Sequence, residues 1–314
     1  MITLSTSKKL GVTTKLIVSY AILLITSGQL LAADLRPGDI VVADSQGAIL
    51  RVEPATGEPT VISSGGNLVR PFGVAMDSNG DILVTDTGAM AIIRVDPQTG
   101  SNTVVSSGGL VGAPYGIAVD RHGNILVANA QVIIRVDPLT GTPSIVSSNA
   151  TFRAPVGIAI APNGDIFVAD LTGAIFRVDP TSGAATTVST GKRLVNPVGI
   201  AMEGGNSLLV ADEGAHAVIR VDAKTGTQEI VAQGGSLVTP VSIAVWPHRE
   251  ILVGDPDAFN LNGVVLRIDP TSNTQTEIYV GSGEMVNPRG IAVVPVDSDA
   301  QDAPNPHGKA GTNP

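Results

Sequence analysis

The chain lacks cysteine altogether, and it has few aromatic and few charged residues. The absence of cysteine excludes disulfides, thiol nucleophiles and thiolate metal sites. Aromatic residues make up 3% of the 314 residues and charged residues 15%, whereas 36 residues are Gly and 21 are Pro. Because hydrophobic residues still account for 43% of the chain, this composition indicates a folded all-β protein with many turns.

Basic residues are scarce relative to acidic ones. Lys and Arg total 19 against 28 for Asp and Glu, which gives a formal net charge of −9. Proteins that bind the phosphate backbone of nucleic acids generally carry a basic footprint. The charge balance therefore predicts that nucleic acid is not a partner of this protein.

The N-terminal region is the one place where basic and apolar residues are segregated. Lys8, Lys9 and Lys15 precede an apolar run over residues 16–25, and the sequence Leu-Leu-Ala-Ala at 30–33 offers small residues for cleavage. This order is typical of a signal peptide, so we expect a cleaved signal over residues 1–32 and an exported protein, periplasmic or extracellular. The alternative is an uncleaved anchor, but the apolar run is short of the roughly 20 residues that span a bilayer. No stable membrane span is expected after cleavage.

One phrase recurs through the remainder of the chain at an interval of roughly 43 residues, a period typical of propellers and solenoids. It reads Pro-Phe-Gly-Val-Ala-Met from Pro71 and returns in similar form from residues 114, 155, 197, 240 and 288. With these prolines as markers, the complete units are 71–113, 114–154, 155–196, 197–239 and 240–287.

Each unit contains four short segments rich in β-branched residues. In the first unit they are residues 71–76, 82–85, 91–95 and 103–106. Asn79-Gly80 favours a tight hairpin turn after the first segment, and the Asp-Pro-Gln-Thr-Gly sequence at 96–100 favours a turn after the third. Four antiparallel strands in each of several repeats predict the blades of a β-propeller.

The repeat is out of phase with the ends of the chain. Residues 38–44 match the second segment of a unit without a first segment before them, and residues 288–293 match a first segment without a second after them. We therefore expect the last copy to lie innermost beside residues 38–70, so that both ends build one mixed blade. This closure predicts a six-bladed propeller over residues 33–295. Residues 296–314 are rich in Pro, Asp, Asn and Gly, and we expect a disordered tail.

Small residues dominate the first segment of each unit. Gly73 and Ala75 are two residues apart and so face the same side of a strand. If this strand lies where the blades converge, larger side chains would collide with the neighbouring blade. The fifth unit has Ser242 in place of the glycine, which is still small.

The pattern P-x-G-I-A-V-D-x-x-G-x-I-L-V-A-D, followed by I-x-R-V-D-P, resembles the NHL repeat over nearly the whole chain after the signal. The resemblance implies a six-bladed propeller closed by a mixed blade. It implies no single function, because NHL-like propellers include RNA-binding and protein-binding modules, peptide-amidating lyases, metal-dependent gluconolactonases and streptogramin lyases.

Two charged positions recur in every unit. The second segment ends in a polar residue, Asp44, Asp86, Asn129, Asp170, Asp212 and Asp255, and the third carries Arg51, Arg94, Arg135, Arg177, Arg220 and Arg267. Rings that bind a cation and an anion are one interpretation. We favour a structural one: Asp accepts backbone N–H groups of loops, and each Arg pairs with a carboxylate or a carbonyl at the same place in each blade.

Candidate binding residues are better sought where the repeat is broken, in the loops of one face. That face is expected to carry Lys192, Asn196, Glu284 and Asn287 together with the residues proposed to bind a ligand. The proposed ligand-binding residues are Arg70, Phe72, Tyr115, Phe152, Arg153, Arg193 and Arg289, with Tyr115 and Phe152 as stacking surfaces. The excess of arginine favours an anionic or sugar-like ligand, and ordinary solvated loops are the alternative.

Two further features suggest chemistry only weakly. Asp257, Asn260 and Asn262 could supply oxygen ligands to Ca²⁺, but the segment lacks an EF-hand pattern and a plain loop is the favoured interpretation, so no cofactor is predicted. His216 lies near Asp212 and Glu213 and is either a general base or part of a solvated loop.

These observations predict a non-enzymatic propeller that binds a protein, peptide or glycan on its loop face, without a catalytic residue. The alternative is an exported metal-dependent hydrolase or lyase, similar to a lactonase. The histidines needed for the metal of a peptide-amidating lyase are not available on one face. No feature of the sequence specifies an oligomeric state.

Overall fold

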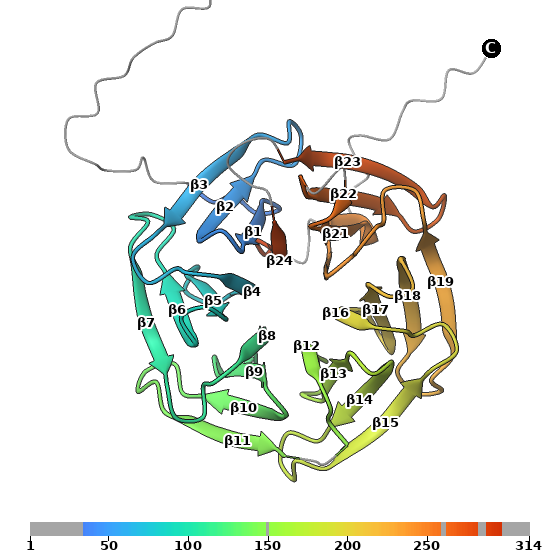
Figure 1. The fold of residues 1–314 in the computed structure, drawn as a ribbon, viewed down its shortest axis with the longest axis horizontal. Coiled ribbons are helices and arrows are strands. Elements are labelled where there is room, and N and C mark those ends of the chain that lie inside the picture. The colour runs from blue at the N-terminus through green and yellow to red at the C-terminus, as the bar shows by residue number, and fades with distance from the viewer. Residues whose placement is uncertain (1–33, 149–150, 259–261, 282–286, 297–314) are drawn as a thin grey trace, which may run out of the picture.

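The computed structural model describes residues 34–148, 151–258, 262–281 and 287–296. The predicted signal peptide (1–32) and all but the first residue of the predicted tail lie outside these described residues. Within them, 24 strands form six four-stranded antiparallel sheets arranged as the blades of a ring (Figure 1). The predicted six-bladed β-propeller is therefore confirmed.

Blades 1 to 3 follow the chain in order from the inner strand to the outer. Blade 1 comprises β4 (Pro71–Met76), β5 (Ile82–Asp86), β6 (Ala91–Val95) and β7 (Asn102–Ser107). Blade 2 comprises β8 (Pro114–Val119), β9 (Ile125–Asn129), β10 (Val132–Val136) and β11 (Pro143–Ser147). Blade 3 comprises β12 (Pro155–Ile160), β13 (Ile166–Asp170), β14 (Ala174–Val178) and β15 (Ala185–Thr190).

Blades 4 and 5 repeat this order, and blade 6 joins the two ends of the propeller. Blade 4 comprises β16 (Pro197–Gly204), β17 (Ser207–Asp212), β18 (Ala217–Asp222) and β19 (Gln228–Gln233). Blade 5 comprises β20 (Ser242–Val245), the 3₁₀ turn Pro247–Arg249, β21 (Ile251–Asp255), β22 (Val264–Asp269) and β23 (Thr274–Val280). Blade 6 comprises β24 (Pro288–Val293), β1 (Ile40–Asp44), β2 (Ala48–Val52) and β3 (Pro59–Ser64).

The closing blade is built as its sequence offset predicts. The innermost strand β24 runs antiparallel to β1, with Val42 opposite Ile291 (Figure 1). Two backbone hydrogen bonds extend the pairing, from Gly38 N–H to the Val294 carbonyl and from Val294 N–H to the Asp39 carbonyl, both at 2.9 Å. The C-terminal strand thereby removes the free inner edge that β1 would otherwise expose.

The hydrophobic core lies between the blades. Every residue of the second strand is buried in all but one blade, because that strand is covered on both faces. For example, Leu209 and Val218 of blade 4 pack against Ile251 and Val253 of blade 5 in one cluster. Burial of each such side chain stabilises the fold by about 1.5–3 kcal/mol relative to exposure, so the ring depends on contacts between neighbours.

The small residues of the inner strands allow these neighbours to approach. A Cβ atom added to Gly116 or Gly157 would lie less than 3.0 Å from a carbonyl oxygen of the next blade, that of Val156 or Val198. Blade 5 departs from this rule with Ser242. There the residue opposite on β21 is Gly254, and a Cβ on Gly254 would lie less than 3.0 Å from the Ser242 hydroxyl. In blade 5 the glycine of this residue pair therefore lies on β21 and not on the inner strand β20.

The six inner strands enclose a narrow apolar channel. Side chains that include Val74, Ile117, Ile158, Ile200 and Ile291 line it, around a volume of about 70 Å³. The axis of the propeller thus presents aliphatic groups.

The described residues include no helix with the length and hydropathy needed to cross a membrane.

Candidate functional site

The face that carries the loops between second and third strands contains the mouth of the channel. Five of the six inner strands begin with the repeat proline, whereas Pro240 lies two residues before β20. In every blade the residue after the proline lines the mouth. These six positions are Phe72, Tyr115, Val156, Val198, Val241 and Arg289. Five of the six side chains are apolar or aromatic, and the closing strand supplies the only charge among them.

The two aromatic rings of this set are in contact. The rings of Phe72 and Tyr115 meet edge to face, with centroids 5.3 Å apart and planes at 78°. Both pack against the cluster of Val156, Val198 and Val241, which are almost fully buried. Edge-to-face pairs of this kind are favourable beyond their buried area, so the two rings hold each other in place.

A cavity of about 400 Å³ opens over these rings. Phe72 and Tyr115 contribute apolar surface to it, together with Leu171, while Arg153 and Arg289 contribute positive charge. Gln131 and Glu213 add an amide and a carboxylate to the wall. An apolar cavity with a few converging polar groups is the usual form of a ligand site.

Arg289 is the less exposed of the two arginines. Its Nε donates a hydrogen bond to Asn287 Oδ1 at 2.7 Å, and the side chain is half-buried. Asn287 is itself held by its backbone N–H, which donates to Asp44 at 3.2 Å. A guanidinium held through Nε keeps its two terminal nitrogens for another acceptor, the arrangement suited to a carboxylate.

The repeated aspartates position the loops around the cavity. Asp170 is fully buried and accepts the N–H groups of Arg153 and Ala154 at 2.9 and 3.0 Å, as well as that of Thr172 at 3.0 Å. Equivalent bonds from the preceding and following loops reach Asp44, Asp86, Asp212 and Asp255. The predicted loop-capping role is confirmed, and it covers the loop before the blade as well as the turn after it. Burial raises the pKa of Asp255 in spite of these bonds.

The repeated arginines pair at the opposite end of the strands, as predicted. Five of the six meet a carboxylate: Arg51 with Asp39, Arg94 with Asp77, Arg177 with Asp165, Arg220 with Glu203, and Arg267 with Glu250. Arg135 instead donates to the Pro180 carbonyl at 3.4 Å. No arginine of this set lines the mouth cavity.

Four of the seven predicted ligand residues, Phe72, Tyr115, Arg153 and Arg289, converge on the mouth cavity, and three do not. Arg70 is exposed on the same face outside the cavity, where its backbone N–H donates to Asp86. Arg193 lies over a separate shallow hollow near residues 225–228, and its N–H donates to Gln228.

Phe152 does not fit its predicted role as a stacking surface. Its ring is 2% exposed and meets Phe176 edge to face at 5.4 Å within the core. Phe152 stands three residues before a repeat proline, the position that Leu68, Leu194 and Leu237 hold in other blades, all of them buried. An alignment of this loop with the equivalent loops of the other blades would have predicted that Phe152 is buried.

Sequence inspection missed Leu171, Glu213 and Gln131. Leu171 and Glu213 each follow directly after a capping aspartate, and Gln131 lies two residues after Asn129. Because the capping residue fixes the direction of the chain as it leaves the second strand, the residues after it are aimed at the mouth. The residue after the capping position differs from one repeat to the next, and this variation could have marked it as a candidate binding residue.

The other candidates have local partners. The Nδ1 atom of His216 contacts the Val238 carbonyl. Asp257 accepts a hydrogen bond from the Thr239 hydroxyl at 2.8 Å, while Asn260 lies outside the described residues. Within the described ranges, no three His, Asp or Glu side chains come together as a metal site would require.

Comparison with known proteins supports the propeller fold but identifies no family. No protein-family model matches the chain. No curated protein matches its sequence. Among solved structures, a chain of the crystal structure of a nidogen/laminin complex is similar, with a TM-score of 0.71 over 82% of this chain and 98% of that chain, at 18% identity. A likeness at this identity supports the propeller fold, and the NHL relationship remains a resemblance of the repeat.

Proposed function

We propose that this protein is a binding module that takes up a segment of a protein partner in the mouth cavity of its loop face. The observation that carries the proposal is the juxtaposition of the Phe72–Tyr115 pair with Arg289 in one cavity of about 400 Å³. Aromatic rings and arginine are the residues that most often dominate the energy of protein interfaces.

The surroundings of the cavity suit a macromolecular partner. Val69, Val195 and Val238 each lie two residues before a repeat proline and are 58%, 48% and 39% exposed. They add exposed apolar surface to the loops that lead into the inner strands. An apolar centre with arginine beside it favours a partner segment that combines an apolar side chain with a carboxylate.

The hydrolase alternative receives less support from the geometry. A metal-dependent lactonase-like site would require ligating side chains that project into the axis, and the described inner strands place aliphatic side chains there. An exported location, which we infer from residues 1–32, is the setting in which the protein would meet its partner.

Selection of peptides from a random library displayed on phage tests the proposal directly, because no partner needs to be known. The purified protein should enrich peptides with an acidic group beside aromatic or aliphatic residues. Phe72→Ala and Arg289→Gln should each weaken binding of the enriched peptides by about tenfold or more. Arg193→Gln is the matched control, since it removes the same charge from the same face outside the cavity.

Two results would overturn the proposal. One is a selection that enriches no peptide family. The other is an enriched family whose affinity is unchanged by Phe72→Ala and Arg289→Gln. Enrichment on a glycan array in place of peptides would assign the cavity to a carbohydrate.

A further inference from the structure

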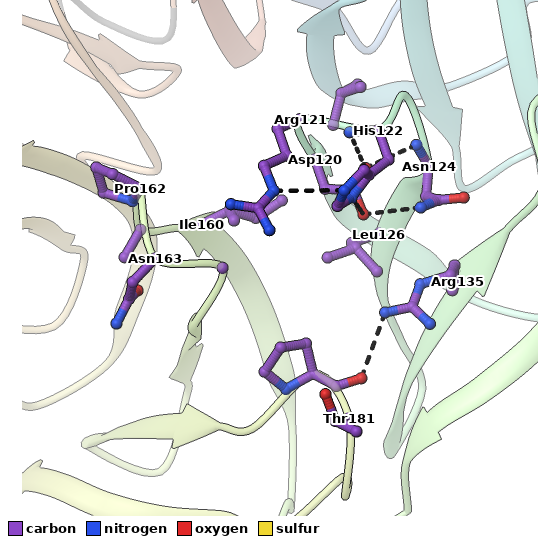
Figure 2. Close-up of a pocket in the computed structure, with 14 residues that line it drawn as sticks. Asp120, Arg121, His122, Asn124, Leu126, Arg135, Ile160, Pro162, Asn163 and Thr181 are labelled. Atoms are coloured by element: carbon purple, nitrogen blue, oxygen red, sulfur yellow. Dashed lines mark hydrogen bonds and ion pairs between the residues drawn. The ribbon is translucent and has the colours of Figure 1, made fainter.

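A second cavity lies at the opposite end of the strands, between the turns of blades 2 and 3. It encloses about 740 Å³ and is lined by both polar and apolar side chains (Figure 2). Its position away from the mouth makes any ligand of this cavity independent of the proposed partner.

The cavity contains Arg135, the one repeat arginine without a carboxylate partner among the residues that the structure describes. In blade 1, Arg94 lies 2.5 Å from Asp77 and 2.9 Å from Asp81, the first and last residues of the turn between the inner two strands. In blade 3, Arg177 lies 2.7 Å from Asp165, the last residue of the equivalent turn. In blade 2, the last residue of that turn is Asn124, so the carboxylate that would meet Arg135 is replaced by a neutral amide.

The remaining acid of the blade 2 turn is engaged elsewhere. Asp120 accepts the N–H groups of His122 and Asn124 at 2.8 and 2.9 Å, and the side-chain amide of Asn124 at 2.9 Å. Arg135 directs Nη2 to the Pro180 carbonyl at 3.4 Å, a long hydrogen bond (Figure 2). Its Nε is buried and has no partner among the residues that the structure describes.

A second arginine borders the same space. Arg121 lies against His122, with 3.4 Å between its Nε and the imidazole Nε2 (Figure 2). The formal charges that line the cavity are those of Arg121, Arg135 and Asp120, which leaves it positive in a chain of net charge −9. A partly buried arginine that lacks its usual acid favours an anion from outside.

The wall between the charges is apolar. Leu126 and Ile160 contribute aliphatic surface, and Pro162 and Pro180 contribute their rings. A volume of this size is within the usual range for a small-molecule site of roughly 300–1,000 Å³. The lining therefore combines a guanidinium for an anionic group with a surface for an uncharged body.

We propose that this cavity binds a small organic carboxylate, whose carboxylate pairs with Arg135 and whose body packs on the apolar wall. The ligand would supply to Arg135 the carboxylate that Asp81 and Asp165 supply to the arginines of the neighbouring blades. A planar carboxylate matches the guanidinium in two parallel hydrogen bonds, which a spherical or neutral ligand cannot reproduce.

Calorimetric titration of the full chain with benzoate tests this assignment, with benzamide as the neutral analogue and inorganic phosphate as the anion without an apolar body. Benzoate should bind saturably and at least tenfold more tightly than either comparison ligand. Arg135→Gln should weaken benzoate binding by about tenfold or more. Asn124→Asp should do the same, because it restores the internal acid and occupies Arg135 while keeping its charge.

Arg177→Gln is the control, since it makes the same substitution at the repeat position of blade 3 and should leave benzoate affinity unchanged. Circular dichroism and the melting temperature of each variant establish that it is folded. The assignment is overturned if benzoate shows no saturable binding, if benzamide or phosphate binds as well, or if folded Arg135→Gln and Asn124→Asp variants keep the affinity of the original chain.

Discussion

Buried aspartate is the residue that most defines this propeller. Asp86 is fully buried, yet it accepts the N–H groups of Val69 and Arg70 from the loop before its blade and those of Gly88 and Ala89 from the turn after it. A carboxylate has enough lone pairs for all four donors. Its repetition in the sequence made this role predictable, because a residue needed by every blade is part of the scaffold.

Ser242 and Gly254 face each other across β20 and β21, so we expect substitutions at these two positions to affect stability jointly. Gly254→Ala alone should destabilise the fold by about 1–3 kcal/mol, because the added methyl group meets the Ser242 hydroxyl and Ile291. The double variant Ser242→Gly/Gly254→Ala restores the Gly–Ala pair that blades 3, 4 and 6 have at this place, and it should recover most of that loss. Urea unfolding of both single variants and the double variant measures the coupling.

We expect the coupling free energy between these two substitutions to be roughly 1 kcal/mol or more. The hydroxyl of Ser242 is buried without a hydrogen-bond partner in the described structure, so Ser242→Gly alone should cost little. Additive effects of the two changes would show that the residues do not share the same space.

The strands and their order were predictable because each strand segment recurs in similar form in every blade. A segment such as Ile82–Asp86 is ambiguous by itself, since a short apolar run fits either a strand or a buried helix. Its copies between regular turn signals remove that ambiguity. The residues of the mouth cavity differ from blade to blade, so repetition gives no guide to them. Phe152 is an example: it was predicted to lie on the surface, although the equivalent residues of other blades are buried leucines.

The closing strand leads to a prediction at this scale. Deletion of residues 288–314 removes β24, exposes the inner edge of β1 and withdraws Ile291 from the cluster it shares with Ile40 and Val42. We expect a melting temperature lower by 10 °C or more, on the order of what a loss of several kcal/mol produces in a domain of this size. Deletion of residues 297–314 leaves every described contact of β24 in place and should change the melting temperature little.

Differential scanning calorimetry of the two truncated chains makes the comparison. Equal melting temperatures would contradict the role assigned to β24. A lower temperature for the longer deletion with two separate transitions would show that the open ring unfolds in parts, whereas one transition would show that all blades depend on closure.

For the whole molecule, the acidic residues act together on stability. The turn between the third and fourth strands begins with a carboxylate in every blade: Glu53, Asp96, Asp137, Asp179, Asp222 and Asp269. Hydrogen bonds from the turn lower the pKa of each of them, through the backbone N–H of Thr140 at Asp137 and through the Thr56 hydroxyl at Glu53. The same small effect is thus repeated around the ring.

A prediction about pH follows from the direction of these shifts. Carboxylates whose pKa is lower in the folded chain contribute stability that is fully present above their unfolded pKa of about 4 and lost as the pH falls through the folded pKa. We therefore expect the urea midpoint to be nearly constant from pH 7 to about pH 5 and to fall below about pH 4. Asp255 shifts in the opposite direction and offsets only a part of this loss.

Urea denaturation followed at several pH values between 7 and 3 provides the measurement. Asp137→Asn should reduce the slope of the decline slightly, since it removes one of six similar groups. A midpoint that rises as the pH falls from 4 to 3 would contradict the prediction.

The pairing of β24 with β1 also has a consequence for the time course of synthesis. Of the strands that the structure describes, Ile40–Asp44 is the first to be made and its inner neighbour Pro288–Val293 is the last. During translation, and during export if residues 1–32 direct it, the nascent chain carries five blades and an incomplete sixth whose edge has no partner. The ring can therefore close only after residue 293 has been made, and a product that ends before residue 288 exposes the inner edge of β1.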